Sequence, residues 1–275
     1  MDGFVQWMEK HFMPKASVIA AQRHLVAIRD AFVVTMPLMI LGALAVLINN
    51  IPIPGYEDFL NKIFPMMYND APIWKSFGGN IWNGTFAIFA VLVAFLVAHN
   101  LVKSYGKDGI AAGTVSVASF FAVGGLEGMG ATGLFIALII ALISGELFQR
   151  LSGNPKLVIK MPDGVPPEVT NSFVALIPGA VILIFFWVVR HMLGFDLNGF
   201  LSQLLMPLKG VLAGNSLFGG LLTVFLICFF WVLGIHGPAI MGPVIRPFWD
   251  ISIAENIDAF NAGTNAQNMP NIFTE

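Results

Sequence analysis

The sequence predicts an all-α polytopic membrane protein with about six transmembrane helices, two amphipathic helices and the start of a re-entrant hairpin. Of its 275 residues, 57% are hydrophobic and only 11% are charged, whereas soluble domains usually carry about 25% charged residues. The mean hydropathy is +0.79. Apolar runs recur along the chain, and about 20 apolar residues are enough to cross the hydrocarbon core as a helix.

The N-terminal segment is typical of a helix that lies at a membrane surface. Large apolar side chains within residues 2–13 fall on one helical face, with charged residues elsewhere. No cleavable signal pattern is present at this end. The first span is expected at residues 31–48 and contains Pro37, which neighbouring helices make tolerable in a membrane.

Five further spans follow from the remaining apolar runs. They are expected at about residues 81–102, 109–123, 132–148, 173–193 and 217–233. The segment 109–123 is short and rich in Ala, Gly and Ser, so we expect other helices to pack closely around it. A second amphipathic helix is expected at residues 195–208. Residues 238–275 alternate apolar and polar pieces without one clean crossing, which favours a re-entrant hairpin over a seventh span.

The placement of Lys and Arg predicts the orientation. With the N-terminus inside, ten of these residues fall in inside segments and four in outside segments. Cytoplasmic loops of membrane proteins carry an excess of Lys and Arg. The N-terminus is therefore predicted to be cytoplasmic.

Composition and motifs also exclude several classes of protein. The net charge of −2 offers no basic field for nucleic acid. The single cysteine, Cys228, rules out an intrachain disulfide. A dinucleotide-type pattern, Gly128-Met-Gly130-Ala-Thr-Gly133, lacks the strand and βαβ unit that it requires, so we interpret it as a chance match. No nucleophile–base pair or metal spacing is evident, so no catalytic residue, cofactor or metal is predicted.

The segment Gly234–Asp250 carries the strongest functional signal. It follows the last apolar run and places His236 between glycines. Broken helices are where transporters commonly build binding sites, and an ionisable group at membrane depth is a functional candidate. Gly237 would let a ligand approach the backbone closely, and Trp231 offers an apolar face of the kind against which sugars stack. A ligand contact and a satisfied core histidine are equally good interpretations of His236 on these grounds.

The tail of the chain is rich in amides, among them Asn271. An amide both donates and accepts hydrogen bonds, which suits the hydroxyl groups of a sugar. An Asn-rich surface loop is the alternative interpretation.

Three separated motifs resemble one known family. They are Ala21–Asp30 with Met36-Pro-Leu38, Pro162–Pro167 with Ser172-Phe173, and Trp231-Val-Leu-Gly-Ile-His-Gly237. The chain, from about residue 8, resembles enzyme IIC, the sugar permease subunit of bacterial phosphotransferase systems. The most similar branch is that of lactose, cellobiose and N,N'-diacetylchitobiose, often called the type 3 enzyme IIC domain.

The resemblance implies a homodimer with an elevator-like transport domain in the bacterial cell membrane. Residues 1–193 would form the dimerising membrane bundle, 194–216 an amphipathic linker, and 217–275 the start of the transport domain. The substrate would be a disaccharide, which enzyme IIB phosphorylates with phosphate that reaches it through enzyme IIA. The chain itself would carry no phosphorylated residue. The predicted substrate-binding residues are Trp231, His236, Gly237 and Asn271.

The sequence departs from the family at its end. It stops at Glu275, whereas family members continue through later spans, a second hairpin and an Asn-Glu-Pro motif that holds the sugar. A C-terminally truncated permease is therefore expected, with a half-built sugar site. Two alternatives are a non-transporting scaffold or dimerisation partner, and a proton-coupled sugar transporter, for whose proton relay His236 alone qualifies.

Overall fold

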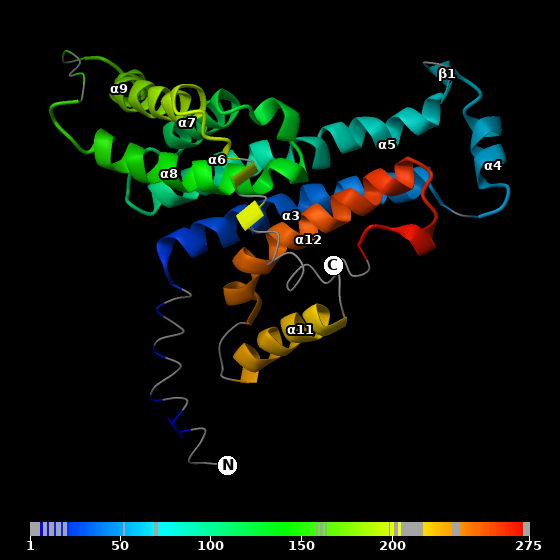
Figure 1. The fold of residues 1–275 in the computed structure, drawn as a ribbon. Helices are drawn as coiled ribbons and strands as arrows, with labels where there is room; N and C mark the ends of the chain where they lie inside the picture. Colours follow the sequence, from blue (N-terminus) through cyan, green and yellow to red (C-terminus); the bar gives the residue numbers. More distant parts are fainter. Residues whose placement is uncertain are drawn as a thin grey trace.

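The computed structural model is a helical protein whose long helices agree with the predicted spans (Figure 1). Four helical stretches are long and apolar enough to cross a membrane: Arg23–Asn49, Ile73–Lys103, Ala131–Ser152 and Ser172–Met192. Two shorter apolar helices lie at Gly109–Ala122 and Leu217–Trp231. The structure describes residues 6, 7, 10, 14 and 18, and residues 21–271 except 52, 69–70, 158, 160–161, 163, 198, 201–202, 205–216 and 233–236.

The elements follow one another along the chain in a simple order. The α-helices are α3 (Arg23–Asn49), α4 (Tyr56–Ile63), α5 (Ile73–Asn83), α6 (Phe89–Lys103), α7 (Gly109–Ala122), α8 (Leu134–Ser152), α9 (Pro167–Trp187), α11 (Leu217–Val232) and α12 (Gly237–Asn261). Short helical turns are η1 (Phe86–Ile88), η2 (Gly125–Gly128), η3 (Ala131–Gly133), the π-helical η4 (Val188–Met192) and η5 (Ala266–Asn268). The strands β1 (Met67–Tyr68) and β2 (Ala71–Pro72) pair antiparallel.

Helix α6 lies at the centre of the core and packs against α3, α7 and α8. Its residues Ala90, Ala94 and Ala98 are fully buried. Small side chains of this kind let helix backbones approach closely in a membrane, where dispersion contacts replace the hydrophobic effect as the driving force. The aromatic rings of Phe32 and Phe89 join α3 to α6 edge-on, with centroids 6.0 Å apart.

Helix α7 confirms the prediction of close packing. Its Ser116, Ser119 and Phe120 are fully buried. A Cβ added at Gly113 would lie 2.7 Å from the ring of Phe95, so only glycine lets α6 come this near. The predicted span from residue 81 is longer than expected, because α5 continues into α6 through a short turn at Gly84 and Thr85.

The turn before α8 explains the glycines of the dinucleotide-type pattern. A Cβ at Gly133 would collide with the backbone of Gly128, 2.8 Å from its carbonyl carbon, and one at Gly130 would lie 3.1 Å from the carbonyl oxygen of Phe86. The amide of Ala90 donates to the carbonyl of Met129. These glycines therefore pack two turns and the start of α6 together, in agreement with the interpretation of the motif as a chance match.

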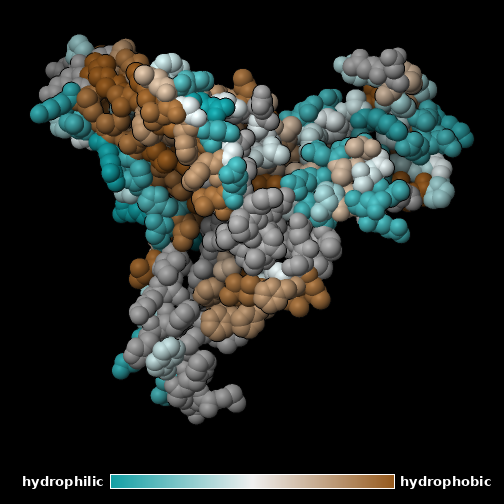
Figure 2. Space-filling view, viewed as in Figure 1, coloured by the Kyte–Doolittle hydropathy of each residue, from teal (hydrophilic) through white to brown (hydrophobic). Residues whose placement is uncertain are grey.

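Apolar side chains cover the outer faces of α9 and α11 (Figure 2). On α9, Leu176, Ile184 and Trp187 are exposed, and on α11 Leu221 and Phe225 are exposed. Exposed apolar surface on this scale marks contact with a membrane or a partner protein, which agrees with a location in the bilayer. Of the two predicted amphipathic helices, nine of the twelve residues 2–13 and seven of the fourteen residues 195–208 lie outside the described residues.

Candidate functional site

The junction of α11 and α12 holds the first three predicted substrate-binding residues. Trp231 lies at the end of α11 with 53% of its surface exposed. Gly237 is the first residue of α12. His236 lies outside the described residues. The structure thus places Trp231 and Gly237 at the two helix ends on either side of the segment that contains the histidine.

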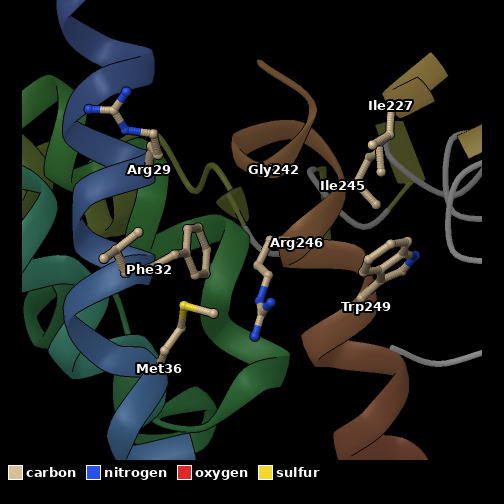
Figure 3. Close-up of a pocket in the computed structure, with 9 residues that line it drawn as sticks. Arg29, Phe32, Met36, Ile227, Gly242, Ile245, Arg246 and Trp249 are labelled. Carbon is tan, nitrogen blue, oxygen red and sulfur yellow. The ribbon is translucent and has the colours of Figure 1, made fainter. Parts of the chain in front are cut away.

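A cavity of about 190 Å³ opens beside this junction, between α3, α11 and α12 (Figure 3). Its lining is Arg29, Phe32, Val33, Met36, Ile227, Gly242, Ile245, Arg246 and Trp249. The wall is apolar and aromatic except for the two arginines. A cavity of this character, lined by apolar groups with a few polar ones, is the usual setting of a small-molecule site.

The two arginines differ in their relation to the cavity. Arg29 donates from Nε and Nη2 to Asp30 Oδ1, at 2.9 and 2.8 Å, and its guanidinium points away from α12 (Figure 3). Arg246 lies between α3 and α12, with its Nε 3.5 Å from Asp250 Oδ1 on the next turn. The side chain of Arg246 is 20% exposed and that of Asp250 5%. A largely buried charge beside an apolar cavity is a candidate for ligand contact, and the sequence analysis did not name Arg246 as a site residue.

Helix α12 corrects one expectation. The sequence analysis interpreted Gly234–Asp250 as a broken helix. This stretch includes Pro238, Pro243 and Pro247, each of which lacks an N–H donor. In the structure, the chain is helical without interruption from Gly237 to Asn261. Pro238 lies in the first turn, where the missing donor has no intrahelical partner to lose. Pro247 is buried, and α12 packs against α3, α8 and α11, whose contacts stabilise the helix in spite of the two internal prolines.

After Asn261 the chain reverses and returns to α12 through Asn271. Gly263 adopts a left-handed conformation with φ of +85°, which favours glycine. Asn256 Nδ2 donates to the carbonyl oxygen of Asn271, and the Asn271 amide donates back to Asn256 Oδ1, both at 3.0 Å. Asn271 Nδ2 donates to the Ser252 carbonyl at 3.2 Å and to Glu255 Oε2 at 2.8 Å. We call these four contacts the asparagine clasp.

The clasp separates Asn271 from the other predicted site residues. Asn271 is 97% buried against the stretch Ser252–Asn256. Ser252 lies fifteen residues after Gly237, which at 1.5 Å per residue is about 22 Å along the helix. The structure therefore brings Trp231 and Gly237 to one end of α12 and Asn271 toward the other.

A second polar cluster joins α3, α8 and the turn after α6. Glu146 on α8 accepts a 2.7 Å hydrogen bond from Tyr105 Oη and lies 3.0 Å from His24 Nε2 and 3.6 Å from Arg150 Nε. The hydrogen bond to Glu146, together with partial burial, raises the pKa of Tyr105. Arg23 lies over the ring of Tyr105 at 4.5 Å. The cluster stabilises one end of the bundle, and its polar groups interact with one another.

Comparison with known proteins agrees with the resemblance seen in the motifs. The family model described as "Phosphotransferase system, EIIC" matches residues 29–275. The "PTS system cellobiose-specific EIIC component" of Geobacillus stearothermophilus is 37% identical over 100% of this chain and 64% of its own. The "Lichenan permease IIC component" of Bacillus subtilis (strain 168) is 38% identical over 98% and 63%.

A solved structure is similar to this chain in sequence and in fold. The crystal structure of the transporter ChbC, the IIC component from the N,N'-diacetylchitobiose-specific phosphotransferase system, matches with a TM-score of 0.85 and 35% identity. The match covers 98% of this chain and 65% of ChbC, so the chain spans about two-thirds of the length of its relatives. With nine-tenths of its residues matched by the family model, this chain belongs to the EIIC family of the phosphotransferase system.

Proposed function

We propose that this chain binds and translocates a disaccharide of the cellobiose, chitobiose or lactose class as the membrane subunit of a phosphoenolpyruvate-dependent phosphotransferase system. One observation carries the proposal: nearly the whole chain is similar in sequence and in fold to EIIC proteins named for cellobiose and N,N'-diacetylchitobiose. Enzyme IIB is the proposed phosphoryl donor to the sugar, and enzyme IIA supplies enzyme IIB. A homodimer in the bilayer with a cytoplasmic N-terminus is the proposed form.

The domain division at residues 193 and 217 is part of the same proposal. The close packing of α6 with α7 and α8, and of α9 with α7 and α8, supports a rigid scaffold over residues 1–193. Helices α11 and α12 pack against each other, and α12 also contacts α3. The cavity of Figure 3 then lies on the proposed boundary, with α3 on the scaffold side and α11 and α12 on the transport side. A sugar bound there would be enclosed by both parts.

The proposed sugar contacts are His236, Trp231 and Gly237, beside the cavity that Arg246 and Trp249 line. The exposed indole of Trp231 offers a flat apolar face for a sugar ring. Trp249 and Arg246 add a second aromatic surface and a donor for hydroxyl groups. A neutral, polyhydroxylated ligand suits this mixture of aromatic surface and few polar groups.

Replacing either His236 or Trp231 with alanine is expected to weaken the binding of cellobiose or N,N'-diacetylchitobiose at least about thirtyfold and to leave dimerisation intact. An aromatic anchor typically contributes about 2 kcal/mol or more, or about thirtyfold in Kd. Isothermal titration calorimetry of the purified protein in detergent measures the affinity. Trp187→Ala is the matched control, because Trp187 on α9 is 50% exposed and lies far along the chain from the site. Undiminished binding in His236→Ala or Trp231→Ala would remove this site assignment.

Coupling to phosphorylation is tested by uptake. We expect cells to accumulate labelled cellobiose only when phosphoenolpyruvate and the cognate enzyme IIB are both supplied, and to accumulate it as the phosphate. Accumulation of free cellobiose that persists without enzyme IIB and stops with a protonophore would instead support the proton-coupled transporter. A purified dimer that binds no sugar would support the scaffold.

A further inference from the structure

A separate pocket lies at the other end of α3. Figure 1 shows that α5 and the last turn of α12 lie beside this end of the helix. The volume of the pocket is about 280 Å³, and its lining is Val46, Asn49, Asn50, Lys75, Gly78, Gly79, Trp82 and Asn261. None of these residues lines the cavity of Figure 3. We call it the amide pocket, after Asn49, Asn50 and Asn261.

The amide pocket suits a neutral, hydroxyl-rich ligand. Each of its three amides has donor and acceptor atoms. Its ammonium group, on Lys75, already pairs with Glu57 Oε1 at 3.0 Å, which weakens any attraction for an anion. Trp82 adds an aromatic surface, and stacking on Phe86 at 4.7 Å and 17° fixes its ring. Amides beside a fixed aromatic ring are a combination that recognises the hydroxyls and the apolar face of a sugar.

One wall of the amide pocket is rigid and carries an unused acceptor. Asn49 Nδ2 donates to the carbonyl of Lys75 at 2.7 Å. Gly78 lets the two helices meet here, since a Cβ at that position would lie only 2.5 Å from Asn49 Cγ. The Oδ1 atom of Asn49 is buried and accepts no hydrogen bond from the described part of the chain. Because this atom is closed to solvent, a ligand would meet the exposed amides of Asn50 and Asn261 instead, both of which line the pocket.

The neighbouring glycine, Gly79, leaves part of the pocket lining without a side chain. A Cβ built at Gly79 meets no atom within 4 Å. Glycine destabilises a helix interior relative to alanine, so the helical backbone of α5 does not itself require glycine at position 79. The absent side chain instead leaves open space in the pocket lining.

We propose that the amide pocket is a second saccharide subsite, which holds one hexose ring on the outer side of the membrane. This inference rests on the proposed function, whose cytoplasmic N-terminus places the end of α3 outside. The volume of about 280 Å³ lies just below the range of about 300–1,000 Å³ for small-molecule sites, which favours one ring over a whole disaccharide. A ring in this pocket would contact α3 and α5 of the proposed scaffold and Asn261 of the proposed transport domain.

Protection of an introduced thiol tests the subsite directly. We would make Gly79→Cys in a Cys228→Ser background, which removes the chain's own cysteine, and label intact cells with a membrane-impermeant maleimide. Cellobiose at ten times its Kd for the pocket is expected to slow labelling about elevenfold, because only the unoccupied fraction reacts. The control is Lys62→Cys in the same background, on exposed α4 outside the pocket. It is expected to label at one rate with or without sugar.

The remaining outcomes separate this inference from the proposed function. Labelling of Gly79→Cys that cellobiose does not slow, or no labelling from outside, would overturn the subsite. Adding Trp231→Ala is expected to leave the protection unchanged, because Trp231 lies on α11, away from the pocket. Loss of protection in that variant would mean that the thiol reports the α11–α12 site, and would also overturn the subsite. Failure of phosphoenolpyruvate-dependent uptake would count against the proposed function alone.

Discussion

Replacing Gly133 with alanine is expected to prevent α8 from packing on α6, and to leave little monodisperse protein after extraction in detergent. The new Cβ would overlap the carbonyl oxygen of Gly128 and lie 2.8 and 3.2 Å from its carbonyl carbon and Cα. Overpacking a core against flexible side chains typically costs about 1–3 kcal/mol. Here the obstacle is backbone, within a turn that also packs against the start of α6. We therefore expect a cost at or above the top of that range.

Gly220→Ala provides the matched control for this substitution. It adds the same methyl group within α11, where a Cβ meets nothing within 4 Å. Alanine has the higher helix propensity, by about 1 kcal/mol, so this variant is expected to be as stable as the parent or more so. Size-exclusion profiles and thermal unfolding in detergent measure both. Equal melting temperatures for Gly133→Ala and the parent would show that the turn relaxes without cost.

Asn271→Ala is expected to release residues 262–271 from α12. The substitution removes the Nδ2 donors to the Ser252 carbonyl and to the Glu255 carboxylate. A neutral hydrogen bond contributes about 0.5–1.5 kcal/mol and one to a charged group about 1.5–3 kcal/mol, so the loss is about 2–4 kcal/mol. Hydrogen exchange of the backbone amides in this segment measures the release. Asn268→Ala, three residues earlier and exposed, is expected to leave exchange unchanged.

The same variant decides between two roles for Asn271. The sequence predicted a sugar contact, whereas the structure shows its side chain hydrogen-bonded within the asparagine clasp. If Asn271 serves the clasp, hydrogen exchange in residues 262–271 rises in the variant. The affinity for cellobiose then changes only if this segment helps to position the sugar site. A loss of affinity with unchanged exchange would establish the direct contact instead.

The spans were predictable because a single property, apolar run length, determines them. Helices lie at all six predicted places, and the small residues of residues 109–123 also predicted how tightly α7 packs. The prolines after Gly237 did not allow the continuous helix to be predicted, because contacts with α3, α8 and α11 decide whether this segment stays helical. Local preference favours a break there, and tertiary packing overrides it.

The candidate site was predictable only where its residues are neighbours in sequence. Trp231 and Gly237 fall together because only five residues separate them. Arg29 and Arg246 line one cavity although more than two hundred residues lie between them, and no local pattern reports such a contact. Asn271 was grouped with the site by its chemistry alone. Its distance from Gly237 depends on the length of the intervening helix, which the predicted break obscured.

The shortness of α7 has a consequence for the surrounding lipid. Its 14 residues cover about 21 Å at 1.5 Å per residue, against about 30 Å for the hydrocarbon core. The side chain of Asp108 caps its first turn, and Gly124 with φ of +99° follows its last. Neither end belongs in hydrocarbon, so a bilayer in contact with α7 beside Ile110, which is 65% exposed, would be expected to thin to match it. Hydrophobic mismatch would then make stability depend on acyl-chain length, with shorter chains favoured on this flank of the protein.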